Sequence, residues 1–209
     1  MQVKKEIQYI TYGEREISHL SAQDPVLARA ISRIGFIARK AEPDLFVALT
    51  SSIISQQIST KAAETVGNRL IEKCGGITPE NVTSQSLEDI MQCGMSGRKA
   101  KYIWELAHAV CCSDLDLTAI SSLPDDEVIQ TLSKYAGIGP WTAEMMLIFS
   151  LKRPDVVSFL DLGIRRGMMK LYNHDTLTKK EFTEHRRKYT PYGTVASLYL
   201  WEIAHESII

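Results

Sequence analysis

The side chain with the clearest potential for chemistry is Asp161, in the segment SFLDLG at positions 158–163. It follows an apolar stretch and precedes a run of helical periodicity, and the N-terminus of a helix favours a negative charge. A carboxylate in partly apolar surroundings can stabilise an oxocarbenium-like sugar and can orient or deprotonate water. The structural alternative is an aspartate that only caps the helix, and Asp161 alone does not decide between the two.

A second feature, the sequence Gly-Ile-Gly-Pro at positions 137–140, lies between two helical segments. Glycines allow a tight turn and a close approach of the backbone to another surface. Ile138 would anchor this turn in the core, and Pro140 would open the next helix with its N–H groups pointing outward. Such a helix start is an anion site that suits a DNA phosphate, although a plain connection between helices remains the alternative.

Composition and charge narrow the class of protein. Apolar residues make up 44% and charged residues 23% of the 209 positions, which is typical of a folded globular protein. No apolar run approaches the roughly 20 residues that span a bilayer, and the first residues lack the apolar core of a signal peptide, so we expect an intracellular protein without a membrane segment. The net charge is −1, but the basic residues cluster at Arg98, Lys99 and Lys101; at Lys152, Arg153, Arg165, Arg166 and Lys170; and at Lys179, Lys180, Arg186, Arg187 and Lys188.

The four cysteines, Cys74, Cys93, Cys111 and Cys112, form no C-x2-C pair. We interpret them as buried thiols of an intracellular protein. A metal pair formed by His108 and Cys111 is geometrically conceivable, since three residues separate them, and it stays open as an alternative.

Helical spacing dominates the chain, and strand signals are confined to residues 7–11 and their neighbours. We therefore expect an all-α fold of two helical lobes with a DNA-binding cleft between them. Ser59 is expected to cap a helix that stops at Gly75, and Ser86 with Asp89 resembles a capping box. The other expected helices cover residues 45–56, 98–111, 125–135, 141–151, 162–172, 179–188 and 192–205.

Four blocks of sequence, taken together, resemble the helix-hairpin-helix, Gly-Pro-Asp superfamily of DNA glycosylases. They are residues 45–59, residues 94–103, residues 137–143 with Asp161, and residues 191–201. The resemblance is closest to the branch of 3-methyladenine DNA glycosylase II and extends from about residue 44 to 205. It implies an N-terminal segment at 1–40 packed on the helical core. The glycosylase fold would occupy 41–209, with the hairpin at 132–151 and the loop of the catalytic aspartate at 155–162.

The resemblance also implies roles for individual residues. Asp161 matches the catalytic aspartate, and Gly137, Ile138 and Gly139 match the hairpin whose amides hold the DNA strand. Gln57 lies where the family presents a side chain to the space left by a flipped base, although a polar residue at a helix end is the plainer alternative. We add Arg98 and Lys99 as DNA contacts from the first basic cluster. A structural Na⁺ or K⁺ ion would be bound by the backbone carbonyls of Ser133, Tyr135 and Ile138.

Trp141 stands where bifunctional relatives have a lysine that attacks the sugar, so the resemblance implies a monofunctional enzyme with no required cofactor. Trp141 and Tyr192 could also form an aromatic base pocket that attracts cationic purines, with core packing as the alternative. Three departures reduce the match: Gly193 replaces a frequent arginine, Met145 replaces an aromatic, and the N-terminal β-rich lobe of longer members is expected to be absent or vestigial. No cluster of four cysteines follows the last helix, so no iron–sulfur cluster is expected.

The sequence therefore predicts a monomeric base excision repair enzyme that flips alkylated purines out of damaged double-stranded DNA and hydrolyses them to leave an abasic site. Its place would be the cytoplasm and nucleoid of a prokaryote or the nucleus of a eukaryote. Two alternatives remain: a glycosylase for 8-oxoguanine, uracil or hypoxanthine, and a non-catalytic DNA-binding module. Asp161 argues against the second, because a carboxylate near the backbone would repel phosphate without serving binding.

Overall fold

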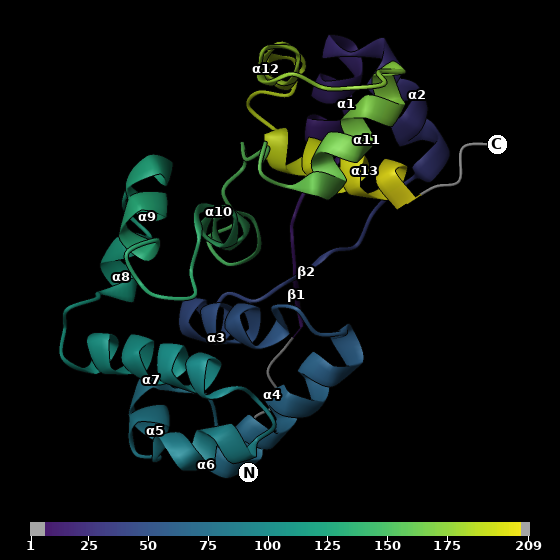
Figure 1. The fold of residues 1–209 in the computed structure, drawn as a ribbon. Coiled ribbons are helices and arrows are strands. Elements are labelled where there is room, and N and C mark those ends of the chain that lie inside the picture. Colours follow the sequence, from purple (N-terminus) through teal and green to yellow (C-terminus); the bar gives the residue numbers. More distant parts are fainter. Residues whose placement is uncertain (1–6, 206–209) are drawn as a thin grey trace. The chain divides into compact units, whose positions relative to one another are not determined.

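The computed structural model describes residues 7–205, and this part of the chain is almost entirely helical (Figure 1). The predicted all-α class is confirmed. The described elements are β1 (Gln8–Tyr9), α1 (Glu14–Gln23), α2 (Pro25–Ile34), β2 (Lys40–Ala41), α3 (Leu45–Ser55), α4 (Thr60–Cys74), α5 (Pro79–Thr83), α6 (Leu87–Gln92), α7 (Gly97–Cys111), α8 (Leu117–Ile120), α9 (Asp125–Leu132), α10 (Pro140–Phe149), α11 (Leu162–Tyr172), α12 (Lys179–Arg187) and α13 (Gly193–His205).

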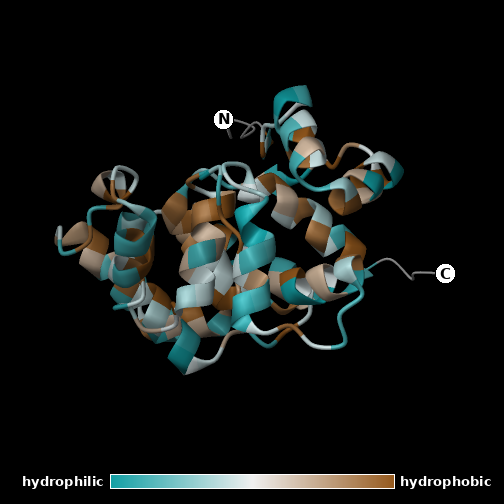
Figure 2. Ribbon diagram, turned by 90° about the horizontal axis from the view of Figure 1, so that it is seen from above, coloured by the Kyte–Doolittle hydropathy of each residue, from teal (hydrophilic) through white to brown (hydrophobic). Residues whose placement is uncertain are grey.

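The chain divides into two compact units. Unit 1 combines the described residues up to Ala41 with those from Lys152 onward, and unit 2 comprises Glu42–Leu151. Hydrophobic and hydrophilic residues are interleaved along the helices of both units, as in amphipathic helices that each bury one face (Figure 2). The family-based division into 1–40 and 41–209 stays a prediction.

In unit 1, α11 and α13 pack closely against each other, and α2 contacts both. The two helices approach closely at Gly167, where an added Cβ would lie 1.9 Å from the carbonyl oxygen of Leu200. Only a glycine fits at this crossing, since any side chain would collide with the backbone of α13. Strands β1 and β2 form an antiparallel pair in which Gln8 lies opposite Ala41.

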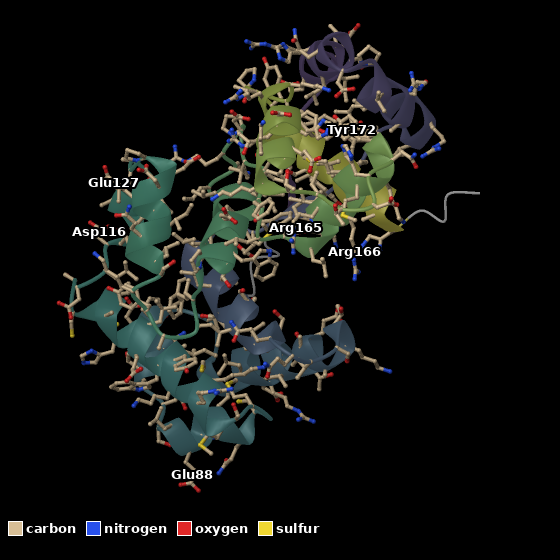
Figure 3. All side chains as sticks on the ribbon, turned by 45° about the horizontal axis from the view of Figure 1, so that its top comes forward. Glu88, Asp116, Glu127, Arg165, Arg166 and Tyr172 are labelled. Atoms are coloured by element: carbon tan, nitrogen blue, oxygen red, sulfur yellow. The ribbon has the colours of Figure 1, made fainter. Side chains whose placement is uncertain are left out.

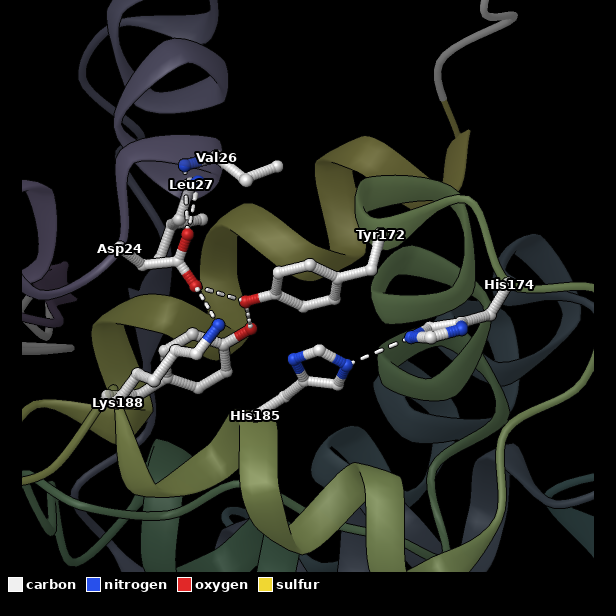
Figure 4. Close-up of polar contacts among 8 residues, drawn as sticks. Asp24, Val26, Leu27, Tyr172, His174, His185 and Lys188 are labelled. Atoms are coloured by element: carbon white, nitrogen blue, oxygen red, sulfur yellow. Dashed lines mark hydrogen bonds and ion pairs between the residues drawn. The ribbon is translucent and has the colours of Figure 1, made fainter.

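A buried carboxylate, Asp24, links the N-terminal helices of unit 1 to its C-terminal ones (Figure 4). It caps α2 through the N–H groups of Val26 and Leu27, and its Oδ2 accepts hydrogen bonds from the Tyr172 hydroxyl at 2.5 Å and the Lys188 ammonium at 3.3 Å. Burial raises the pKa of Asp24, but the bonds from Tyr172, Leu27, Lys188 and Val26 outweigh it and leave that pKa below its ordinary value.

Beside this carboxylate, the ring of His185 stacks on Tyr172 with 3.6 Å between ring centroids. Its Nε2 lies 3.0 Å from Nε2 of His174, so one imidazole donates and the other accepts (Figure 4). Burial, with the positive charge of Lys188 and the neighbouring His174, lowers the pKa of His185. The folded chain therefore favours the neutral form of His185.

Unit 2 is built around α3, which contacts α4, α7 and α10. Its buried face includes Leu49 and Ile53, both completely covered. Helices α4 and α7 start where serines cap them: the Ser59 hydroxyl accepts the N–H of Ala62, and the Ser96 hydroxyl accepts that of Lys99. The predicted start and stop of α4, at Ser59 and the left-handed Gly75, are confirmed.

Several expectations at the level of local structure are wrong in detail. Helix α9 ends at Leu132 rather than residue 135, because the chain turns there toward the left-handed Gly137. At Ser86 only half of the capping box forms, in which the Ser86 hydroxyl accepts the backbone N–H of Asp89. The Asp89 carboxylate accepts the Ser86 hydroxyl and pairs with Lys73 at 2.5 Å. Extended structure within 7–11 is limited to Gln8–Tyr9, and α1 and α2 were not anticipated.

Candidate functional site

Asp161 of unit 1 is the N-cap of α11 and is 7% exposed. Its Oδ1 accepts the backbone N–H of Ile164 at 2.8 Å and the indole N–H of Trp201 at 3.0 Å, while its own N–H donates to the Ser158 hydroxyl. Asp161 therefore caps α11, as the structural alternative from the sequence predicted. The indole bond from another helix is additional, and it fixes the orientation of the carboxylate more tightly than a cap requires.

Gly163 allows Trp201 to reach this carboxylate. A Cβ at position 163 would lie 2.8 Å from Cδ1 of Trp201 and 3.1 Å from Oδ1 of Asp161. The Trp201 ring also lies near Arg39, whose guanidinium carbon is 5.7 Å from the ring centroid. Sequence reasoning included Trp201 only within a matching block and gave it no role, because nothing in the local pattern connects positions 161 and 201.

The surface next to Asp161 is apolar. Leu160 is 52% exposed and Leu162 is 50% exposed, so two leucine side chains flank a nearly covered carboxylate. Exposed apolar side chains beside a buried carboxyl group are compatible with a binding surface. The combination suits a ligand that approaches the carboxylate while water is displaced from the leucines.

The predicted hairpin lies in unit 2, between α9 and α10. Gly137 has a φ of +87°, and a Cβ there would lie 2.6 Å from Cδ2 of Tyr102, so the turn requires glycine. Ile138 is 4% exposed, which confirms it as the anchor of the turn. Gly139 differs: its φ is −92° and a Cβ would meet nothing within 4 Å. The fold alone does not need glycine at 139, whereas a ligand pressed against the backbone would.

Helix α10 starts at Pro140, and no side chain caps it. Its first turn therefore presents the positive end of the helix dipole beside Gly139, which is the arrangement expected of an anion site.

The carbonyls proposed for a cation belong to Ser133, Tyr135 and Ile138, in the same turn. The Tyr135 carbonyl accepts the N–H of Ile138 at 3.1 Å and retains a second lone pair. The buried hydroxyl of Ser133 has no hydrogen-bond partner in the described part of the chain. Neutral oxygens with unused acceptor capacity fit a hard cation such as Na⁺ or K⁺, and the ion itself stays a prediction.

The two glutamines between α3 and α4 have different surroundings. Gln57 is exposed and has a φ of +59°, which is unusual for a residue with a side chain. Gln56 is half-buried, and its amide nitrogen donates to the Gly137 carbonyl at 2.8 Å. The structure therefore leaves Gln57 as the residue of the pair that projects outward.

The first basic cluster is divided by the structure. Arg98 is exposed, but the Lys99 ammonium donates to the carbonyl oxygens of Ile54 at 2.8 Å and Gln56 at 2.6 Å. Burial and the charge of Arg98 lower the pKa of Lys99. Lys99 thus makes contacts within the protein where the sequence suggested DNA, and a DNA contact through it stays a prediction.

The two aromatic residues proposed for a base pocket belong to different units. Trp141, in the first turn of α10, is 43% exposed. Tyr192 is half-buried, and its ring contacts His19 at 5.1 Å between centroids. A pocket shared by the two rings stays a prediction.

Gly193, where the family resemblance implied a frequent arginine, is buried. Its N–H donates to Oδ1 of Asp155, and a Cβ would lie 2.5 Å from that oxygen. There is consequently no room for an arginine at this position.

Many residues of the other basic clusters also contact their own chain. Lys152 donates to Gln8, Lys170 to the carbonyl of Ala204, and Arg186 to that of Asp155. Arg165 and Arg166 extend from α11 (Figure 3), where the Arg165 guanidinium lies 5.3 Å from the Phe159 ring. The exposed basic residues include Arg98, Arg166, Lys179, Lys180 and Arg187.

The expectation of four buried thiols is wrong, because Cys111 and Cys112 lie exposed at the end of α7. His108 contacts Cys112, one turn away, at 3.6 Å rather than Cys111. No group of three or more potential metal ligands occurs among the described histidines, cysteines and acidic residues.

Comparison with known proteins shows the family of the chain. The family model of the HhH-GPD superfamily base excision DNA repair proteins matches residues 50–191. The chain is 31% identical over 212 residues to DNA-3-methyladenine glycosylase 1 of Schizosaccharomyces pombe, covering 97% of this chain and 92% of that protein. The chain belongs to the HhH-GPD superfamily of base excision DNA repair proteins.

Two solved structures extend the similarity to three dimensions. The crystal structure of a DNA-3-methyladenine glycosidase from Bacillus halodurans has a TM-score of 0.86 and 38% identity, covering 95% of this chain and 93% of that one. A 3-methyladenine DNA glycosylase of Schizosaccharomyces pombe, in complex with abasic DNA, has a TM-score of 0.79 and 31% identity, covering 92% and 98%. None of the described helices has the length and apolar character needed to cross a membrane.

Proposed function

We propose that the chain is a monofunctional DNA glycosylase that releases alkylated purines of the 3-methyladenine type from double-stranded DNA. The observation that carries this proposal is the near-full-length similarity, in sequence and in fold, to enzymes named for 3-methyladenine. The proposal includes action as a monomer on damaged duplexes.

Asp161 is the proposed catalytic residue. N3- or N7-alkylation gives the purine a positive charge, so the base leaves as a neutral molecule with the electron pair of the bond from C1′ to nitrogen. The carboxylate stabilises the cationic sugar that results. Water then forms the new bond to C1′ and releases its proton, which Asp161 can accept. The Trp201 and Ile164 donors at Oδ1 support this role because they hold the carboxylate in one orientation.

The hairpin is the proposed DNA-backbone site. Open space at Gly139 and the uncapped start of α10 would admit a phosphate against backbone N–H groups. Gln57, projecting from its strained turn, is the proposed plug for the space left by the flipped base. The Na⁺ or K⁺ ion, when bound by the carbonyls of Ser133, Tyr135 and Ile138, would add positive potential near that phosphate.

A panel of duplexes, each with one defined lesion, tests this function by measuring base release. We expect release of 3-methyladenine and 7-methylguanine, and little release of 8-oxoguanine, uracil or hypoxanthine. The matched control is Asp161→Asn, whose amide oxygen can still accept the N–H groups of Ile164 and Trp201. This variant should bind abasic DNA at least as tightly as the wild type and release no base. Preference for a neutral lesion would refute the substrate class, and near-normal turnover by Asp161→Asn would refute the catalytic assignment.

A further inference from the structure

We infer that Lys99 is a positioning residue, which holds the turn that presents Gln57 in register with the hairpin, and not a contact to DNA phosphate. The inference rests on the proposed function for its meaning in catalysis. It concerns a residue that sequence alone places with the DNA contacts, and it follows from contacts that all lie within unit 2.

The first step is the position of the Lys99 ammonium. It lies at the C-terminal end of α3, where it donates to the carbonyls of Ile54 and Gln56 at 2.8 and 2.6 Å. These are carbonyls at the end of a helix, which the helix itself leaves without partners and where a positive charge is favourable. The ammonium thus fixes the residue immediately before Gln57.

The second step is the backbone of the turn. A left-handed conformation at Gln57 costs free energy in a residue with a side chain, so it persists only where neighbouring contacts impose it. Helix α3 ends on one side of Gln57, and α4 starts at Thr60 under the Ser59 cap on the other. The bonds from Lys99 fix the first of these two ends.

The third step connects this turn to the hairpin. The side chain of Gln56 donates to the Gly137 carbonyl at 2.8 Å, and Tyr102 of α7 packs against the same glycine. Lys99 is three residues before Tyr102 on α7, so one helix supports both the turn and the hairpin. A plug that enters a duplex and a hairpin that grips its backbone must keep a constant spacing, and this network provides it.

The test compares Lys99→Met with Arg98→Met, a neighbour that is exposed. We expect Lys99→Met to slow single-turnover base release by about tenfold to a hundredfold, the effect of losing hydrogen bonds to a charged group. The slope of log affinity against log salt concentration should stay at its wild-type value. Arg98→Met should reduce that slope by about 0.9, as expected for the loss of one phosphate contact.

Amide hydrogen exchange gives a readout that does not depend on activity. In Lys99→Met, peptides that cover residues 56–60 should exchange faster than in the wild type, while Arg98→Met should leave them unchanged. A reduced salt slope with unchanged exchange would make Lys99 a phosphate contact and overturn the inference. If the wild type releases no base from any duplex, the proposed function fails, and the exchange data still decide the positioning.

Gln56→Leu provides an independent variant should Lys99→Met not fold. It keeps the backbone carbonyl that Lys99 binds and removes only the bond to Gly137. We expect slower base release at an unchanged salt slope, and faster exchange at residues 136–139. Normal release with normal exchange would show that the link to the hairpin contributes nothing and would overturn the inference.

Discussion

Replacing Trp201 by phenylalanine tests how strongly catalysis depends on the orientation of Asp161. The substitution keeps an aromatic ring on α13 and removes the indole N–H that donates to Oδ1 of Asp161 at 3.0 Å. The N–H of Ile164 still reaches the same oxygen, so α11 keeps its cap. The carboxylate then loses a hydrogen bond that comes from another helix.

The magnitude follows from the burial of the pair. Asp161 is 7% and Trp201 is 9% exposed, so water has little access to replace the lost donor. A hydrogen bond to a charged group contributes about 1.5–3 kcal/mol, and about 1.36 kcal/mol corresponds to a factor of ten in rate. If this whole free energy is lost from the transition state, base release becomes about tenfold to a hundredfold slower.

Single-turnover release from an alkylated duplex, at saturating enzyme, measures this effect without a contribution from binding. The control is Trp104→Phe, because Trp104 lies on α7 and stacks on His108. That variant should release base at the wild-type rate. Circular dichroism and affinity for abasic DNA show whether each variant is folded. A folded Trp201→Phe that releases base at the wild-type rate would refute the reasoning.

Three further predictions concern the hairpin, the reaction type and the stability of unit 1. Gly139→Ala should weaken binding to all duplexes alike and leave the unfolding temperature unchanged. The control Gly13→Ala, where a Cβ also meets open space, should change neither the binding nor the unfolding temperature. A loss of binding confined to one lesion would contradict the assignment of the hairpin to the DNA backbone. Because Trp141 offers no amine, borohydride should trap no covalent complex on lesion DNA, and strands should break only after alkali or heat. Burial and nearby positive charge lower the pKa of His185 from 6.5, so the unfolded chain binds more protons just below that pH. The free energy of unfolding in urea should therefore rise with pH through this window and rise less in His185→Gln.

Local features of the fold were predictable from the sequence because they depend on neighbouring residues. The α4 helix begins at Ser59 and ends at Gly75, since a hydroxyl cap and a left-handed glycine act within a few positions. Helix α11 has the predicted bounds for the same reason, with Asp161 at its start. The predicted end of α9 was wrong because the chain leaves the helix for the left-handed turn at Gly137, where Tyr102, which is distant in sequence, leaves no room for a side chain.

The sequence by itself determined the helical class, the family and the position of the candidate carboxylate, since each depends on spacing and motif order along the chain. Only the tertiary structure showed that Trp201 binds Asp161 across 40 positions and that Lys99 binds the end of α3. The type of a basic or aromatic residue fixes what it can donate, but its partner is chosen by helix packing. Contacts between separate helices therefore remain outside what a single sequence can show.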